Sequence, residues 1–354
     1  MKKLLSIALV LVLILSLGTT AFAAKEPTVE PGDELVITKN LKVKGYMETG
    51  ATTTKAKYPA DTVSFTTPVG TVSEGGTLAT AAPELTVTGC TITEGDTLAK
   101  IFVTVPDFPD IGIYTYTFKE NASDVAGVTV LSTDITVIFT VIQGDSGKPI
   151  VAAVHCENPV EPIYFDDEGK PTSETANSKK TSEFDNTFEA GALEVSKTVT
   201  GNMGDQSKKF AIKVTFESDD NIGSTITYGD NGKISPEDWQ NGSASVTVQL
   251  AHGESALFDN IPKGVTYSVV ELDEDGSNEL SSGDTSTDKY KVTITNPTGD
   301  IAAETLSSSA VTNEKNADID TGITLDSLPY IMIAVLVLAG LAVMVIRKRR
   351  YNED

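Results

Sequence analysis

The sequence predicts an all-β protein built from two tandem Ig-like antiparallel β-sandwich domains. Short runs of alternating apolar and polar residues recur along the chain, and turn-forming pairs such as Asn231-Gly232 and Asn296-Pro297 separate them. No long helical pattern occurs between the two ends. Regularly spaced short strands with turns between them are typical of β-sandwiches. The 354 residues are enough for two domains of ordinary size.

The alternating runs define the strands that we expect. They lie at residues 35–41, 85–88, 101–105, 114–118, 135–141, 210–216, 244–250 and 290–294. A single turn of helix is expected near residues 235–239, where a proline follows a serine. Successive side chains of a strand point to opposite faces, so each run predicts which of its residues are buried.

Both ends of the chain carry apolar segments. Lys2 and Lys3 precede an apolar run at residues 4–17. Small residues follow this run, so residues 1–23 are expected to be a signal peptide that is cleaved between Ala23 and Ala24. A second apolar run at residues 331–346 is followed by basic residues. It predicts a C-terminal transmembrane sorting segment within 317–354, with the body outside the cell and the precursor anchored in the membrane.

Composition excludes several classes of protein. The formal net charge of −23 leaves no basic patch for nucleic acid. Only His155 and His252 are present, so neither a histidine-based metal site nor a hydrolase triad is expected. We expect no cofactor. The two cysteines, Cys90 and Cys156, are compatible with one disulfide bond and equally with two free thiols.

The two halves of the chain form a diverged repeat. Each half contains a lysine, a glutamate and an asparagine in the same order and in similar local sequence: Lys39, Glu120 and Asn186, then Lys197, Glu271 and Asn313. The repeat predicts modules at 29–190 and 191–316, joined at the small residues 190–192. The glutamate-to-asparagine spacing is longer in the first half, which predicts a loop-like insertion at 149–180.

All six residues share the face of the apolar side chains of their strands, which points them at the interior. Lys42 and Lys44 are alternative candidates for the buried lysine of the first module. Lys39 is preferred because the apolar Leu35 and Ile37 lie on its face of the strand. A single lysine, glutamate or asparagine on the apolar face of a strand is more often an edge residue or a hydrogen-bonded side chain than a reactive group. Two ordered triads with matching surroundings favour a chemical role instead.

Burial lowers the pKa of a lysine and raises the pKa of a glutamate. A neutral amine is nucleophilic, and a protonated carboxyl polarises an amide and transfers protons. The triads therefore predict isopeptide bonds from Lys39 to Asn186 and from Lys197 to Asn313, with Glu120 and Glu271 as the catalytic groups. Each reaction happens once and releases ammonia. The chain modifies itself and is not expected to be an enzyme.

Several segments resemble Gram-positive sortase-assembled backbone pilins, and more specifically the streptococcal pilin isopeptide-linkage domain family. They are residues 184–188, 195–203, 267–271 and 320–330. The resemblance implies a structural subunit of a cell-surface pilus. It implies a sortase and other pilin subunits as partners, together with peptidoglycan and host-surface ligands.

In that family a sortase cleaves between the threonine and glycine of an LPxTG-like motif. Residues 318–322 align with this motif but lack its leucine and proline. The resemblance implies cleavage between Thr321 and Gly322 and leaves the sortase class open. Simple membrane anchoring is the alternative.

The resemblance also implies an acceptor lysine in the first module, shortly before the strand that carries the asparagine. Lys179 is the first choice and Lys180 the second, because small and polar residues surround them. Two ordinary loop lysines are the alternative. For the whole protein, the alternative to a pilin is a monomeric surface adhesin that binds a host ligand through residues 149–180, or a membrane-anchored stalk.

Overall fold

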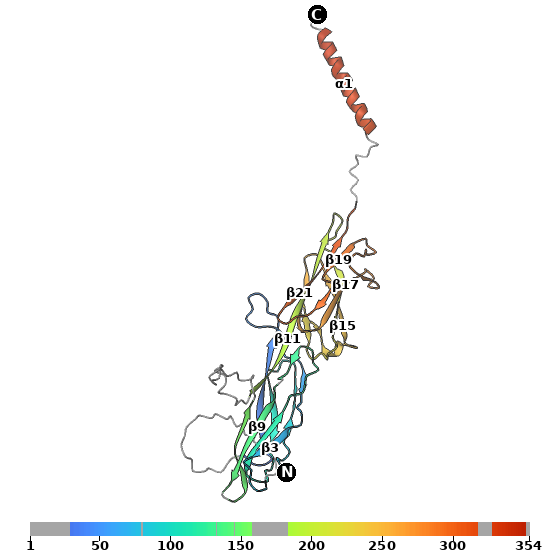
Figure 1. The fold of residues 1–354 in the computed structure, drawn as a ribbon. Coiled ribbons are helices and arrows are strands. Elements are labelled where there is room, and N and C mark those ends of the chain that lie inside the picture. The colour runs from blue at the N-terminus through green and yellow to red at the C-terminus, as the bar shows by residue number, and fades with distance from the viewer. Residues whose placement is uncertain are drawn as a thin grey trace, which may run out of the picture.

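The computed structural model describes residues 29–78, 81–131, 133–144, 146–157, 183–317 and 328–351. Two β-sandwiches lie end to end and share one long strand (Figure 1). The expected all-β fold is confirmed, and every strand expected from the alternating runs is present within a few residues of its predicted bounds. The helical turn expected near 235–239 is the 3₁₀ turn η2 (Pro236–Asp238).

The first module packs two sheets face to face. One sheet has the order β4 (Thr86–Thr88), β6 (Leu98–Thr104), β1 (Glu34–Lys44) and β11 (Glu183–Thr200), and β8 (Val128–Thr129) also pairs with β11. The other sheet has the order β10 (Pro149–Glu157), β9 (Ile135–Gln143), β7 (Gly112–Phe118) and β3 (Val69–Ser73). A separate pair joins β2 (Asp61–Val63) to β5 (Cys90–Ile92).

The second module repeats this plan. One sheet has the order β14 (Gly232–Ile234), β13 (Ile226–Tyr228), β16 (Ser255–Pro262), β11, β21 (Leu306–Glu314) and β19 (Lys291–Thr295). The facing sheet has the order β15 (Ser243–Leu250), β12 (Phe210–Glu217), β17 (Thr266–Leu272) and β18 (Glu279–Leu280), and β20 (Thr298–Asp300) also pairs with β17.

Strand pairing departs from the expected all-antiparallel pattern at two places. The pairs β1–β11 and β11–β21 are parallel. In each module these are the first and last strands, so the rest of the module provides the long connection that a parallel pair requires.

Strand β11 joins the two modules without a break. The sequence predicted two short strands that meet at residues 190–192. The structure instead has one strand in which the buried parity changes from even to odd positions across Ala190, Gly191 and Ala192. A Cβ on Gly191 would lie 2.3 Å from the backbone oxygen of Ala302, so only glycine fits there. The module bounds 29–190 and 191–316 stay a prediction.

Each module has its own apolar core between its two sheets. Members of the first core include Ile101, Tyr114, Phe118, Phe139 and Phe184. Members of the second include Leu193, Phe216, Phe258, Val265 and Val311. Burying one such side chain contributes about 1.5–3 kcal/mol, so the two cores supply most of the driving force for folding.

Polar contacts join the two modules beside β11. The Glu94 carboxylate accepts hydrogen bonds from the backbone N and the Oγ1 of Thr225, at 2.7 and 2.8 Å. Asn260 accepts from the backbone N of Lys57 at 3.1 Å and donates to the backbone oxygen of Thr225 at 2.9 Å. Its φ of 62° lies in the left-handed region that asparagine tolerates.

Two expectations require correction. Residues 149–157 of the predicted loop-like insertion form the edge strand β10, because Pro149 begins the strand and alternate apolar residues follow it. The apolar run at 331–346 lies in helix α1 (Leu328–Tyr351). No helix in the part of the chain that the structure describes is long and apolar enough to cross a membrane.

The contact between Glu94 and Thr225 predicts a measurable contribution to stability. In Glu94→Ala the backbone N–H of Thr225 loses its partner at a half-buried site, so the free energy of unfolding should fall by about 1–3 kcal/mol. Chemical denaturation measures this change. Glu84→Ala removes an exposed carboxylate of the same module and serves as the control. Equal stability of the two variants would contradict the prediction.

Candidate functional site

The first triad lies between the two sheets of the first module. Lys39 Nζ is 2.5 Å from Glu120 Oε2 and 2.7 Å from Asn186 Oδ1. Asn186 Nδ2 donates to Glu120 Oε1 at 2.7 Å, which closes a ring of three side chains. Lys39 and Asn186 are 0% exposed, and Glu120 is 7% exposed. The structure therefore brings together the three residues that the sequence predicted for this module.

The second triad has the same arrangement in the second module. Lys197 Nζ is 2.6 Å from Glu271 Oε2, and Asn313 Nδ2 donates to Glu271 Oε1 at 2.7 Å. All three side chains are buried. Asn313 Oδ1 is also buried, and within the described part of the chain it has no hydrogen-bond partner.

Parallel strand pairing places each lysine next to its asparagine. In β1–β11 the residue paired with Asn186 is Leu41, two positions after Lys39. In β11–β21 the residue paired with Asn313 is Val199, two positions after Lys197. The register is identical in the two modules. Since residues two apart share a face, lysine and asparagine point together into the core.

The two glutamates come from the facing sheets. Glu271 lies in β17, as expected for a middle strand. Glu120 lies two residues after the end of β7, in an isolated bridge with Phe65, and not in the strand itself. Each glutamate therefore reaches across the sandwich to the lysine and asparagine of the opposite sheet.

The structure shows that Lys39, and neither Lys42 nor Lys44, is the buried lysine of β1. Lys42 forms an ion pair with Asp185 at 2.5 Å, and its side chain is 58% exposed. Lys44 lies 3.7 Å from Glu189, and its side chain is 53% exposed. Both point to solvent because Lys39 and Leu41 occupy the inward parity of β1.

Burial controls the charge of both buried lysines. Loss of water lowers the pKa of Lys39 below its ordinary value, and the attraction of Glu120 opposes this effect without cancelling it. The pKa of Lys197 is lowered for the same reason, again against Glu271. Burying a charged pair costs several kcal/mol per ion before its attraction is counted. Both sites therefore favour the neutral amine more than a solvated lysine does.

Small apolar clusters surround the triads. Leu41 pairs with Asn186 and Ala99 pairs with Lys39, and both belong to a buried cluster with Tyr58, Ile92 and Phe188. At the second, Lys197 Nζ lies 4.2 Å from the centre of the Phe210 ring, and this ring packs edge-on against Tyr290. Such surfaces exclude water and strengthen the electrostatic interactions within each triad.

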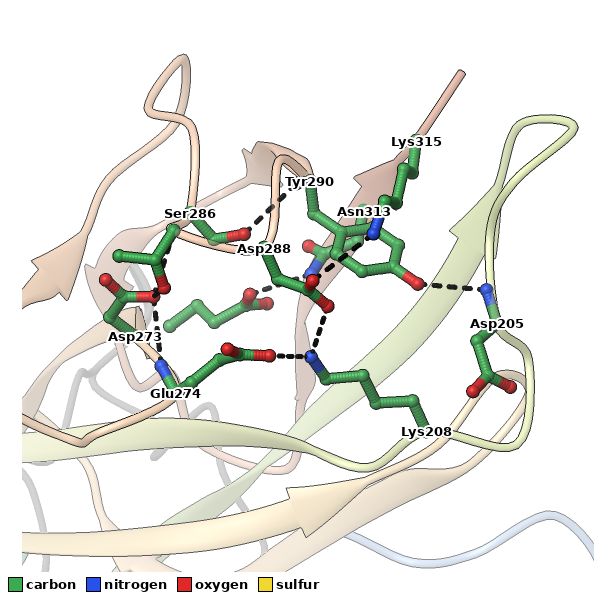
Figure 2. Close-up of polar contacts among 11 residues, drawn as sticks. Asp205, Lys208, Asp273, Glu274, Ser286, Asp288, Tyr290, Asn313 and Lys315 are labelled. Carbon is green, nitrogen blue, oxygen red and sulfur yellow. Dashed lines mark hydrogen bonds and ion pairs between the residues drawn. The ribbon is translucent and has the colours of Figure 1, made fainter. Parts of the chain in front are cut away.

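Ion pairs cover the second triad at the surface. Figure 2 shows Asp288 between Lys208 and Lys315, beside Asn313; the two pairs measure 2.8 and 3.3 Å. Lys208 also pairs with Glu274. Lys208 and Glu274 also line a cavity of about 250 Å³, together with Glu271. The sequence did not reveal this cover, because its members are far apart in the chain and each is an ordinary surface charge.

Other predicted residues lie outside the described part of the chain. They are Ala23 and Ala24 of the signal peptide, Lys179 and Lys180, and the expected cleavage residues Thr321 and Gly322. Cys90 and Cys156 are both free thiols in the structure, which decides between the two alternatives for them. Burial raises the pKa of Cys156 to about 12.

Comparison with known proteins gives three similarities. A domain of unknown function (DUF7601) matches residues 191–315. The protein named Pilin from Streptococcus pyogenes serotype M1 is 26% identical over 365 residues, which cover 95% of this chain and 98% of that protein. The pilus tip adhesin Cpa of Streptococcus pyogenes is 32% identical over 80 residues, or 22% of this chain and 11% of that protein.

Solved structures give the same result for the fold. The crystal structure of the major pilin from Streptococcus pyogenes covers 82% of this chain and 100% of its own, with a TM-score of 0.51 and 21% sequence identity. At this identity the likeness establishes the fold. Together with the relative that matches along nearly the whole chain, it confirms the resemblance to Gram-positive pilins that the sequence predicted.

The cover of the second triad predicts a pH dependence of stability. Lys208 and Lys315 hold the pKa of Asp288 below its usual value, while the unfolded chain keeps an aspartate pKa of about 4. The stabilisation of the folded chain by ionised Asp288 is therefore complete above about pH 4. It is lost as the pH falls through the lower folded-state pKa. Asp288→Asn should lower Tm at pH 7 and have little effect on Tm below the folded-state pKa.

Thermal unfolding across this pH range tests the expectation. Asp219→Asn makes the same change of charge at an exposed position of the same module, so it controls for net charge. A Tm difference from the wild type that is the same at neutral and at acidic pH would contradict the role given to Asp288.

Proposed function

We propose that this chain is a structural subunit of a cell-surface pilus and that each of its two modules forms one Lys–Asn isopeptide bond. One observation carries the proposal: two buried triads of identical composition occupy the same strand register in two successive sandwiches. Similarity to the Streptococcus pyogenes Pilin over nearly the whole chain supports the pilus role.

The reaction follows from the contacts in the first triad. The neutral amine of Lys39 attacks Cγ of Asn186, and a new C–N bond forms. Glu120 contacts both Nζ and Nδ2, so it takes a proton from the amine and passes it to the leaving nitrogen. The bond from Cγ to Nδ2 breaks, ammonia leaves, and the carbonyl is restored. No external reagent is needed.

The same sequence of steps is available in the second triad. Glu271 bridges Lys197 Nζ and Asn313 Nδ2 at 2.6 and 2.7 Å. Folding holds the reacting groups together, which replaces an encounter in solution by a reaction within one molecule. Two ordinarily unreactive side chains can therefore react without a separate enzyme.

The bond would constrain a long loop in each module. Lys39 and Asn186 are 147 positions apart. By the loop-closure argument used for disulfides, a link of this span adds about 5 kcal/mol to stability. Unlike a disulfide, an amide resists reduction, which suits a fibre exposed outside the cell.

Assembly of the subunits is the second part of the proposal. A sortase cleaves between Thr321 and Gly322 and transfers the Thr321 carbonyl to an amine of the next subunit, with Lys179 as the first candidate and Lys180 as the second. Other pilin subunits are then covalent partners, and peptidoglycan receives the last subunit. The chemistry requires an accessible amine, and the lysines of both triads are buried.

Intact mass tests the internal bonds. The wild-type chain should have a mass lower than its mature sequence by two molecules of ammonia. Glu271→Ala should lack only the second bond and Glu120→Ala only the first, because each carboxylate serves its own triad. Loss of one bond should lower the free energy of unfolding by about 5 kcal/mol.

Glu217→Ala removes an exposed carboxylate of the second module and controls for the substitution itself. It should retain both bonds. A full sequence mass for the folded wild-type chain would remove the basis of the proposal.

Covalent assembly is tested in cells that contain the cognate sortase. Lys179→Arg keeps the positive charge but removes the primary amine, so the ladder of covalent multimers in cell-wall extracts should collapse while both internal bonds remain. Peptide mapping of the extracted protein should end at Thr321.

Lys148→Arg is the matched control, because it changes another lysine of the first module. If Lys179→Arg, Lys180→Arg and the double variant all form normal ladders, the acceptor lies elsewhere. A wild-type protein that is only monomeric would favour the surface adhesin instead.

A further inference from the structure

We infer that the backbone N–H of Leu131 and the hydroxyl of Tyr58 form an oxyanion site for the first isopeptide bond, and that the second triad has no counterpart among the described residues. The inference rests on the proposed function, because it concerns how the proposed reaction is accelerated. It predicts that the two bonds form by the same steps but depend on different residues.

The need for such a site comes from the reaction itself. When the amine adds to Cγ, the carbonyl electrons move to Oδ1, which becomes negatively charged until ammonia leaves. An unpaired negative charge in a dry interior is costly, whereas a hydrogen-bond donor fixed near the oxygen stabilises it. Removing one such donor from an enzyme typically slows its reaction about 10²–10³-fold.

Leu131 supplies the first donor. Asn186 Oδ1 accepts hydrogen bonds from Lys39 Nζ at 2.7 Å and from the backbone N of Leu131 at 3.3 Å. The first bond is lost when Nζ moves onto Cγ, but the second remains. Because a backbone N–H only donates, it also keeps Oδ1 on its own side and directs Nδ2 to Glu120. The leaving group is thus held beside its proton source.

The Tyr58 hydroxyl is the second donor of the proposed site. Tyr58 is 1% exposed, and among the described residues its hydroxyl has no hydrogen-bond partner. Leaving a buried hydroxyl unpaired costs about 1–3 kcal/mol, so its presence calls for a reason. The ring packs against Phe188, which shares a strand face with Asn186. Burial raises the pKa of Tyr58, so the hydroxyl keeps its proton. A smaller opposing effect comes from contact with the Asn186 side chain, which sets the hydroxyl beside that carboxamide.

The second triad lacks both features. Asn313 Oδ1 has no hydrogen-bond partner in the described part of the chain. The nearby Tyr290 hydroxyl instead accepts a hydrogen bond from the backbone N of Asp205 at 2.9 Å, and Figure 2 shows it directed there. Lys197 rests on the Phe210 ring, which has no hydroxyl. Removing Tyr58 Oη should therefore affect one bond only.

The test follows both bonds in one molecule. The full chain is synthesised in a cell-free system, samples are quenched in denaturant over time, and the two cross-linked peptides are quantified after proteolysis. In Tyr58→Phe the first cross-link should form about 10²-fold more slowly relative to the second. The second cross-link is an internal clock that corrects for synthesis and folding.

Tyr116→Phe is the matched control. It removes a buried hydroxyl of the same module that donates to the backbone oxygen of Pro83 at 2.9 Å, away from the triad. It should leave the ratio of the two rates unchanged. In a Glu120→Ala background, where no first bond forms, Tyr58→Phe should not lower Tm, because the hydroxyl has no partner to lose.

The outcomes separate this inference from the function on which it rests. Wild-type cross-links with an unchanged ratio of rates in Tyr58→Phe would overturn the oxyanion site and leave the proposed function standing. An equal slowing by Tyr116→Phe would also overturn it, because the effect would then act through folding. Absence of both cross-links from the wild-type chain would overturn the proposed function together with this inference.

Discussion

The burial of a lysine amine against a carboxyl and a carboxamide is the constraint on which the rest of this structure depends. A charged amine is unstable at 0% exposure, as for Lys39, unless it is paired, and pairing does not restore its full hydration. The lowered pKa of both triad lysines is the physical result. The neutral amine that burial favours is also the form that attacks an amide, so one feature explains both the electrostatics and the proposed chemistry.

Strand β11 joins this chemistry to the architecture. It ends the first module with Asn186 and begins the second with Lys197, so one strand carries a reacting group for each triad. Its change of buried parity at residues 190–192 lets Asn186 and Lys197 both face inward, although their numbers have opposite parity. The pairing of β11 with β16 shifts register between Gly191 and Leu193, at the same place. If both bonds form, the covalent path from Lys39 to Asn313 passes through β11.

The sequence predicted the strands and the six triad residues, because strand alternation determines which side chains are buried. It chose Lys39 over Lys42 by local sequence and by parity, and the structure places these side chains as predicted. It missed the strand β10, because the prolines and acidic residues of the 149–180 region are typical of a loop. It also missed the continuity of β11, because small residues weaken the alternation. Leu131 was not predictable either, since a backbone N–H leaves no signal in the sequence. The cover around Asp288 depends on tertiary contacts between ordinary surface charges.

A crystal structure of the wild-type protein at high resolution tests the central claim most directly. The account predicts continuous electron density from Lys39 Nζ to Cγ of Asn186, and from Lys197 Nζ to Cγ of Asn313, with the length of an amide bond, about 1.33 Å. Planar geometry at each link and no density for either Nδ2 atom should accompany it. Separate amines at hydrogen-bonding distance of about 2.7–3.2 Å, with both carboxamides intact, would contradict the account.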